Sequence, residues 1–146
     1  MESYDLKKMF GEISKRHSFE KKFNGWFKEG RECIVLLDLQ KSKLGNYHQL
    51  MIKIYVQGVF GKKYIISKEL IKDTGDVFRG EPLEFKEFLN LNLLIDECVR
   101  KQKLEDLFNE FIIPFTNQAL SKKGLKELEK QEKVFLLPEI KQQLEK

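Results

Sequence analysis

The chain has 146 residues, of which 41% are hydrophobic, 34% charged and 12% aromatic. This length matches one compact domain and leaves no room for a barrel of eight βα units. The apolar share is large enough to build a core, which excludes wholesale disorder. We therefore expect a single domain over residues 1–146.

The net charge of +4 is unevenly distributed. Residues 1–72 carry 15 basic and 8 acidic side chains, whereas residues 73–146 carry 12 basic and 15 acidic ones. Such an asymmetry marks a basic surface for an acidic partner, or it reflects plain solvation of a lysine-rich surface. The two halves could also attract each other across the fold.

The first expected element is an amphipathic helix over residues 4–19. Its apolar side chains, among them Leu6, Phe10 and Ile13, recur at three- and four-residue spacings. Ser3 is a suitable N-cap, because its hydroxyl can accept a hydrogen bond from a free backbone N–H of the first turn.

Strands follow, because the hydrophobic period changes. Residues 22–28 are rich in aromatic side chains, residues 31–40 contain an apolar run, and side chains alternate along residues 48–60. Short connections between these segments predict an antiparallel meander. Residues 64–66 and 77–79 are expected to add short edge strands.

Helices dominate again after Pro82. Apolar stripes predict helices over residues 88–112, ended or kinked by Pro114, and further helices over 121–131 and 138–144. Strands followed by helices favour an α+β fold over alternating βαβ units. The expected architecture is an antiparallel sheet of about four to five strands within residues 20–80. One helix precedes this sheet, and C-terminal helices within residues 88–146 follow and cover it.

The cysteines and the lengths of the apolar runs indicate the cellular location of the protein. Cys33 and Cys98 lie far apart inside apolar stretches, so no disulfide framework is expected. The first residues lack the pattern of a signal peptide, and the longest apolar runs are far shorter than the ~20 residues that span a bilayer. We expect a cytoplasmic protein that does not associate with a membrane.

No motif for metal, cofactor or covalent chemistry is found. The two histidines, His17 and His48, are expected at a helix end and at the exposed start of a strand, so neither a metal site nor a cofactor is predicted. Lys41 and Ser42 are adjacent and would point to opposite sides of a strand, which separates a base from a nucleophile. No catalytic residue is assigned, and the protein is more readily interpreted as a non-enzyme.

Polar residues gather where the most apolar strand ends. Asp38, Gln40 and Ser42 share one strand face if the extended run persists. This face either emerges into water or lines a polar cleft that would gather Gln40, Ser42, Lys53 and Arg79.

The same strand carries a resemblance to a known family. Gln40-Lys41-Ser42, followed by a strand that leads to Gly58, resembles a bacterial family of small proteins, the domain of unknown function number 4304. Arg79 and the Ile113-Pro114-Phe115 segment match its later part, so the resemblance spans roughly residues 18–120. It implies an α+β domain and brings no established activity.

Three functions remain open. The first is a non-enzymatic interaction module that binds a protein partner through an exposed sheet face or its loops. The second is binding of nucleic acid or another polyanion by a basic-aromatic patch of Lys22, Trp26, Lys28 and Arg31. The third is a small hydrolase or transferase whose polar cleft lies at the Gln40–Ser42 strand end.

Overall fold

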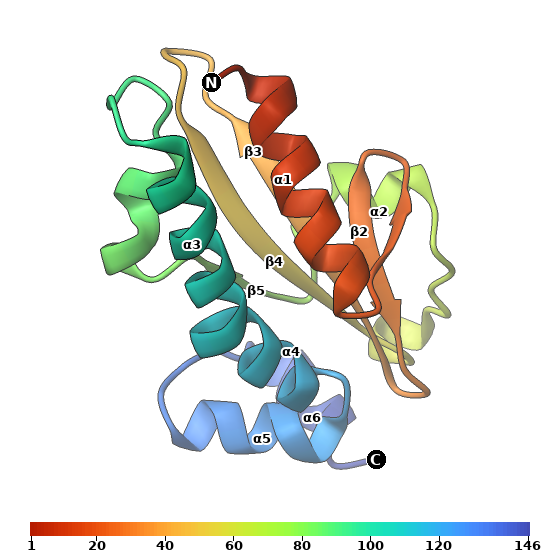
Figure 1. Ribbon diagram of the computed structural model, residues 1–146. Helices are drawn as coiled ribbons and strands as arrows, with labels where there is room; N and C mark the ends of the chain where they lie inside the picture. Colours follow the sequence, from red (N-terminus) through yellow and green to blue (C-terminus); the bar gives the residue numbers. More distant parts are fainter.

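The computed structural model describes all 146 residues. Its centre is one sheet of five strands in the order β1-β2-β3-β4-β5, in which every neighbouring pair is antiparallel. The strands are β1 (Glu20–Lys22), β2 (Gly25–Glu29), β3 (Cys33–Lys41), β4 (His48–Val56) and β5 (Val77–Gly80). The α+β class and the antiparallel meander are confirmed (Figure 1).

One helix precedes the sheet and several follow it. The α-helices are α1 (Ser3–Arg16), α2 (Lys68–Lys72), α3 (Glu97–Leu107), α4 (Ile113–Ala119), α5 (Lys122–Lys130) and α6 (Pro138–Leu144). Short helical turns are η1 (Val59–Gly61), η2 (Leu83–Leu89) and the π-helical η3 (Phe108–Ile112). None of these helices is both long and apolar enough to cross a bilayer.

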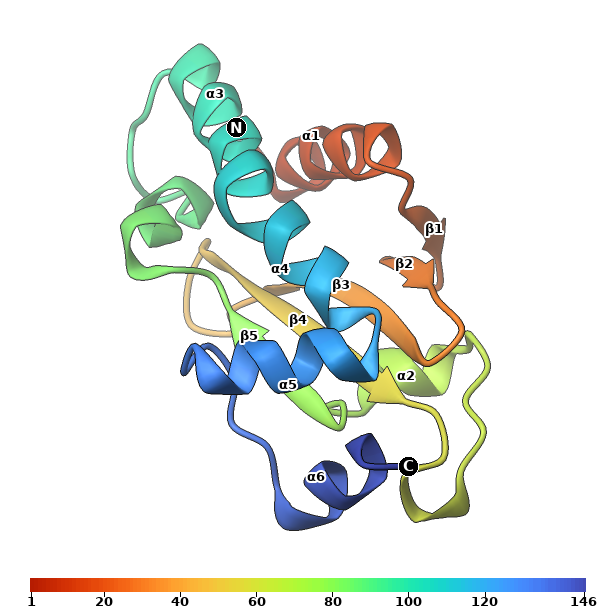
Figure 2. The ribbon, with the colours of Figure 1, turned by 90° about the horizontal axis from the view of Figure 1, so that it is seen from below.

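The sheet has two unequal faces. Along β3, Val35, Leu37 and Leu39 point into a core cluster of 28 buried residues to which α1 and α3–α6 contribute. Ile34 and Leu36 point the other way, into a cluster of five that includes Leu70 of α2. Figure 2 shows α1 and α3 on one side of the sheet and α2 on the other. Coverage on both sides explains why this strand is apolar on both of its faces.

The first strand prediction is corrected in one respect. Residues 22–28 are not one strand, because the chain reverses at Phe23 and Asn24, whose φ angles are 53° and 68°. Two successive left-handed residues make the tight turn that suits a two-residue hairpin. The result is the β1–β2 hairpin, closed by the pair Lys22 and Gly25.

The strand predicted at residues 64–66 is wrong. The Gln57 side chain forms hydrogen bonds with both backbone groups of Tyr64. Its Nε2 donates to the carbonyl oxygen at 2.9 Å, and its Oε1 accepts from the N–H at 2.7 Å. These two hydrogen bonds take the place of pairing with another strand.

The preceding strand, β4, ends at Val56 instead of continuing to residue 60, because Gly58 turns the chain with φ of 92°. The edge strand predicted at residues 77–79 is present as β5.

The helices also differ from expectation: α1 ends at Arg16 and not at residue 19, and α3 begins at Glu97 and not at residue 88. Glu2 and not Ser3 precedes α1, and the Asp5 carboxylate accepts a hydrogen bond from the Glu2 N–H at 2.9 Å. Pro114 does not end the helical path, because the wider π-helical turn of η3 comes directly before it and leads into α4. The short helix α2 was not predicted.

Candidate functional site

A groove lies between α1 and the β1–β2 hairpin. The helix packs on the sheet through Leu6, Phe10 and Ile13, which are fully buried. After α1 the chain reverses at Ser18, whose φ is 70°, and Phe19 enters the core. Strand β1 then runs back beside the helix, so the groove has one helical wall and one strand wall.

The groove encloses about 630 Å³. Ten residues line it: Lys7, Lys8, Gly11, Glu12, Lys15, Ser18, Phe19, Glu20, Lys21 and Trp26.

The floor of the groove is apolar and closely packed. Trp26 is only 3% exposed, and its ring centroid lies 5.1 Å from that of Phe10. A side chain at Gly11 would place its Cβ 3.1 Å from the indole Nε1, so the glycine lets the indole approach the helix backbone. Phe19, which is also 3% exposed, completes the floor.

Four lysines form the rim. Lys7, Lys8 and Lys15 come from α1, where Lys8 and Lys15 stand about 10.5 Å apart along the helix axis. Lys21 of β1 is paired with Trp26 in the hairpin register, and paired residues share a face of the sheet. All four are exposed, and none of the six ion pairs in the protein involves them.

Two carboxylates also line the groove. Glu20 is already paired with Lys22, at 3.4 Å between Oε1 and Nζ, whereas Glu12 has no ion-pair partner. Four ammonium groups against two carboxylates give the groove an excess of positive charge. It can therefore attract carboxylates while still offering hydrogen-bond acceptors.

Two of the four residues predicted for a polar cleft are brought together. The Asp38 carboxylate accepts hydrogen bonds from Lys53 Nζ and from Gln40 Nε2, both at 2.9 Å. Lys53 also donates to the Ile71 carbonyl at 2.7 Å, which links the sheet to the end of α2. Asp38 and Lys53 are 7% and 3% exposed, so the ion pair is buried, and only Gln40 at its edge is exposed.

The other two cleft residues lie elsewhere. Ser42 follows the end of β3, where its Oγ accepts the Leu44 N–H at 3.1 Å and shapes the turn to β4. Arg79 is paired with Ile52 and thus lies on the opposite face, where it donates to the Lys133 carbonyl at 2.6 Å. The single cleft predicted from Gln40, Ser42, Lys53 and Arg79 does not form.

The four residues of the predicted basic-aromatic patch also lie on different parts of the molecule and do not form one patch. Lys22 and Trp26 are on opposite faces of the hairpin, and Arg31 lies in the turn after β2, beside a different hollow. Lys28 lies over the Phe19 ring at 4.3 Å from its centroid, and burial lowers the pKa of its ammonium group. Trp26 has no free face on which a base could stack.

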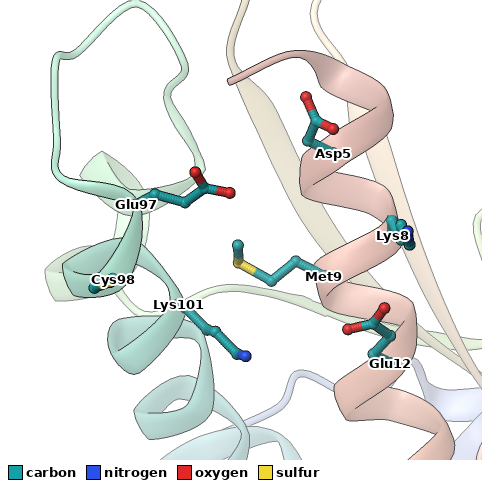
Figure 3. A pocket seen from close by; sticks show the side chains of 7 residues that line it. All are labelled: Asp5, Lys8, Met9, Glu12, Glu97, Cys98 and Lys101. Atoms are coloured by element: carbon teal, nitrogen blue, oxygen red, sulfur yellow. The ribbon is translucent and has the colours of Figure 1, made fainter.

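A second hollow, of about 390 Å³, separates α1 from α3. Figure 3 shows Met9 and Lys101 reaching into it from opposite helices, with Glu97 above. Its charged side chains are Asp5, Lys8, Glu12, Glu97 and Lys101. Because acidic and basic groups alternate around it, this hollow has no strong preference for a ligand of either sign.

Reactive groups are few. No group of three or more histidine, cysteine, aspartate or glutamate side chains is arranged to hold a metal ion. Burial raises the pKa of the Cys33 thiol to about 12, which leaves it almost fully protonated at neutral pH. His48 stands at the start of β4 as predicted, but it is buried at 3% exposure instead of lying on the surface.

Comparison with known proteins adds no assignment. No family model, no curated protein and no solved structure matches the chain. The candidate site therefore rests on the geometry of the groove.

The sequence contained part of the signal for this groove. Lys8, Gly11 and Lys15 recur on one helix face, and a glycine there, which has no Cβ, lets another element approach the helix closely. What approaches it is the Trp26 ring, and this pairing depends on the chain reversal after α1. Residue spacing alone does not reveal that reversal.

Proposed function

We propose that the protein is a non-enzymatic interaction module whose groove between α1 and the β1–β2 hairpin binds an acidic segment of a partner protein. The observation that carries this proposal is the set of four exposed lysines without ion-pair partners, Lys7, Lys8, Lys15 and Lys21, above an apolar floor. Carboxylates of the ligand would pair with the lysines.

An extended peptide fits the dimensions of the rim. The separation of about 10.5 Å between Lys8 and Lys15 along the helix equals about three residues of an extended chain. Acidic residues spaced by three positions could therefore reach both lysines. Glu12, which has no ion-pair partner, offers an acceptor for a backbone N–H of the peptide.

The burial of the aromatic rings favours a peptide over a nucleic acid. Recognition of single strands relies on bases stacking on exposed aromatic faces, whereas Trp26 and Phe19 are each only 3% exposed.

We also propose that the chain belongs to the family of the domain of unknown function number 4304. The matching residues have structural roles that such a family would need to keep. Gln40 donates to Asp38, Ser42 shapes the β3–β4 turn, and Gly58 adopts a left-handed φ. These roles concern the fold and are separate from the groove.

Trp26 is the only tryptophan in the chain, so its fluorescence reports directly on the groove. The experiment titrates the protein at low salt with a hexapeptide of two glutamate–leucine–serine repeats, whose glutamates are three positions apart, and with the same peptide carrying glutamine for glutamate. We expect the acidic peptide to shift the emission and to bind at least tenfold more tightly. Added salt should weaken the binding, because exposed charge pairs are screened.

Reversing the charge of groove lysines tests whether the peptide binds in the groove. The double variant Lys8→Glu/Lys15→Glu should weaken binding of the acidic peptide at least tenfold. The control Lys123→Glu/Lys130→Glu makes the same charge change on exposed positions of α5 and should leave the affinity within twofold. Equal binding of both peptides, or an equal loss in the control, would contradict the proposal. Tighter binding of a single-stranded oligothymidine would replace it with the nucleic-acid function.

A further inference from the structure

His48 lies beneath the first turn of α1. It is the first residue of β4 and is only 3% exposed. Its Nε2 lies 2.8 Å from the Oγ of Ser3, the first residue of α1. This hydrogen bond fastens the start of the helix to the sheet.

The surroundings of His48 favour the neutral ring over the protonated one. Lys7 of α1 and Lys41 of β3 are the charged groups that act on it, and with burial they lower its pKa. The Leu89 backbone acts in the opposite direction but is the smallest of these influences, and no hydrogen bond of normal geometry reaches the buried Nδ1.

No carboxylate compensates a charge on the ring. In the hollow beside it, Glu81 accepts the Leu50 N–H at 3.0 Å and lies 3.4 Å from Lys86. Glu87 lines the same hollow and makes no ion pair or hydrogen bond with His48. A protonated His48 would thus be a buried cation repelled by two lysines, which is unfavourable.

We propose that His48 is a pH switch for the groove: when its ring gains a proton, the first turn of α1 loosens and the acidic segment is released. This inference rests on the proposed function. Lys7 provides the connection, because it acts on His48 and also stands on the rim of the groove.

The first turn of α1 is the part of these surroundings that can move. His48 and Lys41 are paired within the central strands of the sheet, whereas Tyr4, next to Ser3, is 73% exposed. Repulsion between the charged ring and Lys7 is relieved when the turn moves outward. That movement takes Lys7 away from the ligand and leaves three lysines on the rim.

The first experiment measures the affinity of the acidic hexapeptide at pH 7.5 and pH 5.5. Glutamates of the peptide stay largely ionised at both values, since their ordinary pKa is about 4.3. We expect the wild-type protein to bind at least fivefold more weakly at pH 5.5, a typical coupling between two sites. The variant His48→Gln should bind equally at both pH values.

The chain offers a matched control, because it contains only two histidines. His17 caps the other end of α1 and stacks on Phe108. The variant His17→Gln should retain the pH dependence of the wild type. Loss of that dependence in His17→Gln, or its persistence in His48→Gln, would overturn the assignment to His48.

A second measurement needs neither ligand nor variant. Hydrogen exchange of the Leu6 amide, which donates to the Glu2 carbonyl, reports on the first turn. After correction for intrinsic exchange, its protection should fall along the same titration curve as the NMR signals of the His48 ring. Unchanged protection between pH 7.5 and 5.5 would overturn the switch. If protection falls but no peptide binds at either pH, the switch stands and the proposed function fails.

Discussion

The two faces of the sheet are stabilised in different ways. On one face, α1 and α3–α6 bury a cluster of 28 residues, nearly all of them held by apolar contact. On the other, five buried residues share the space with the Asp38–Lys53 ion pair. There the Tyr55 hydroxyl also donates to the Leu70 carbonyl at 2.5 Å.

This difference indicates how each face should respond to change. Apolar burial has no preferred direction, and its contribution grows with the area removed from water. Buried polar pairs add less net stability, but each group left without its partner is strongly unfavourable. The large face should therefore respond to loss of volume, and the small face to loss of a partner.

The largest effect is expected on the large face. Phe10 is fully buried and contacts the rings of Trp26 and Phe108. The variant Phe10→Ala should lower the free energy of unfolding by about 3–5 kcal/mol, because it leaves a cavity. Urea denaturation measures this. Phe60→Ala, at a side chain that is 70% exposed, should change stability by less than about 0.5 kcal/mol.

The small face should show a partner effect of nearly equal size. Lys53→Met leaves Asp38 buried without its cation and should destabilise the protein by about 3 kcal/mol. The double variant Lys53→Met/Asp38→Leu removes both charges and should recover most of that loss. Urea denaturation of both variants gives the comparison. If the double variant is no more stable than the single one, volume and not charge pairing governs this face.

A smaller effect is expected where a single neutral hydrogen bond is removed. Tyr55→Phe keeps the ring and deletes the hydroxyl that reaches Leu70. Thermal and urea unfolding should show a loss of about 1 kcal/mol. A loss as large as that of Phe10→Ala would mean that this hydroxyl fixes α2 and its flanking segments as a unit.

The smallest stability effect should appear as a pH dependence at His48. Its pKa is lowered in the folded protein, so below the ordinary value of about 6.5 the unfolded chain binds more protons. The free energy of unfolding should therefore fall as pH decreases from 7.5 to 5.5. Subtracting the same curve for His48→Gln isolates this contribution. A difference that is constant with pH would contradict the prediction.

The sequence predicts the fold well where side-chain periodicity is strong. The apolar run from Cys33 to Leu39 and the alternation in β4 define the central strands. The β1–β2 turn was not predicted, because the residues with left-handed φ values are Phe23 and Asn24 and neither is a glycine. Residues 64–66 look like a strand by composition, and only the side chain of Gln57 gives Tyr64 other backbone partners.

The site was harder to predict than the fold. Trp26 is aromatic and surrounded by lysines in sequence, which suggests an exposed stacking surface. Its burial depends on Gly11, a residue 15 positions earlier that admits the indole against α1. Asp38, Gln40 and Lys53 do meet, but the Ile71 carbonyl of α2 binds Lys53, and Asp38 and Lys53 are buried. The burial of Trp26 and that of the Asp38–Lys53 pair both depend on contacts between helices and strands, which residue spacing does not reveal.

The residues that line the groove all come from one short segment of the chain. All ten of its lining residues fall between positions 7 and 26, and the sheet pairs only strands that are neighbours in sequence. Bringing the two walls together therefore closes only a short loop, which has a small entropic cost and favours rapid folding. During synthesis, the whole groove sequence emerges from the ribosome before any residue of α3–α6 has been made.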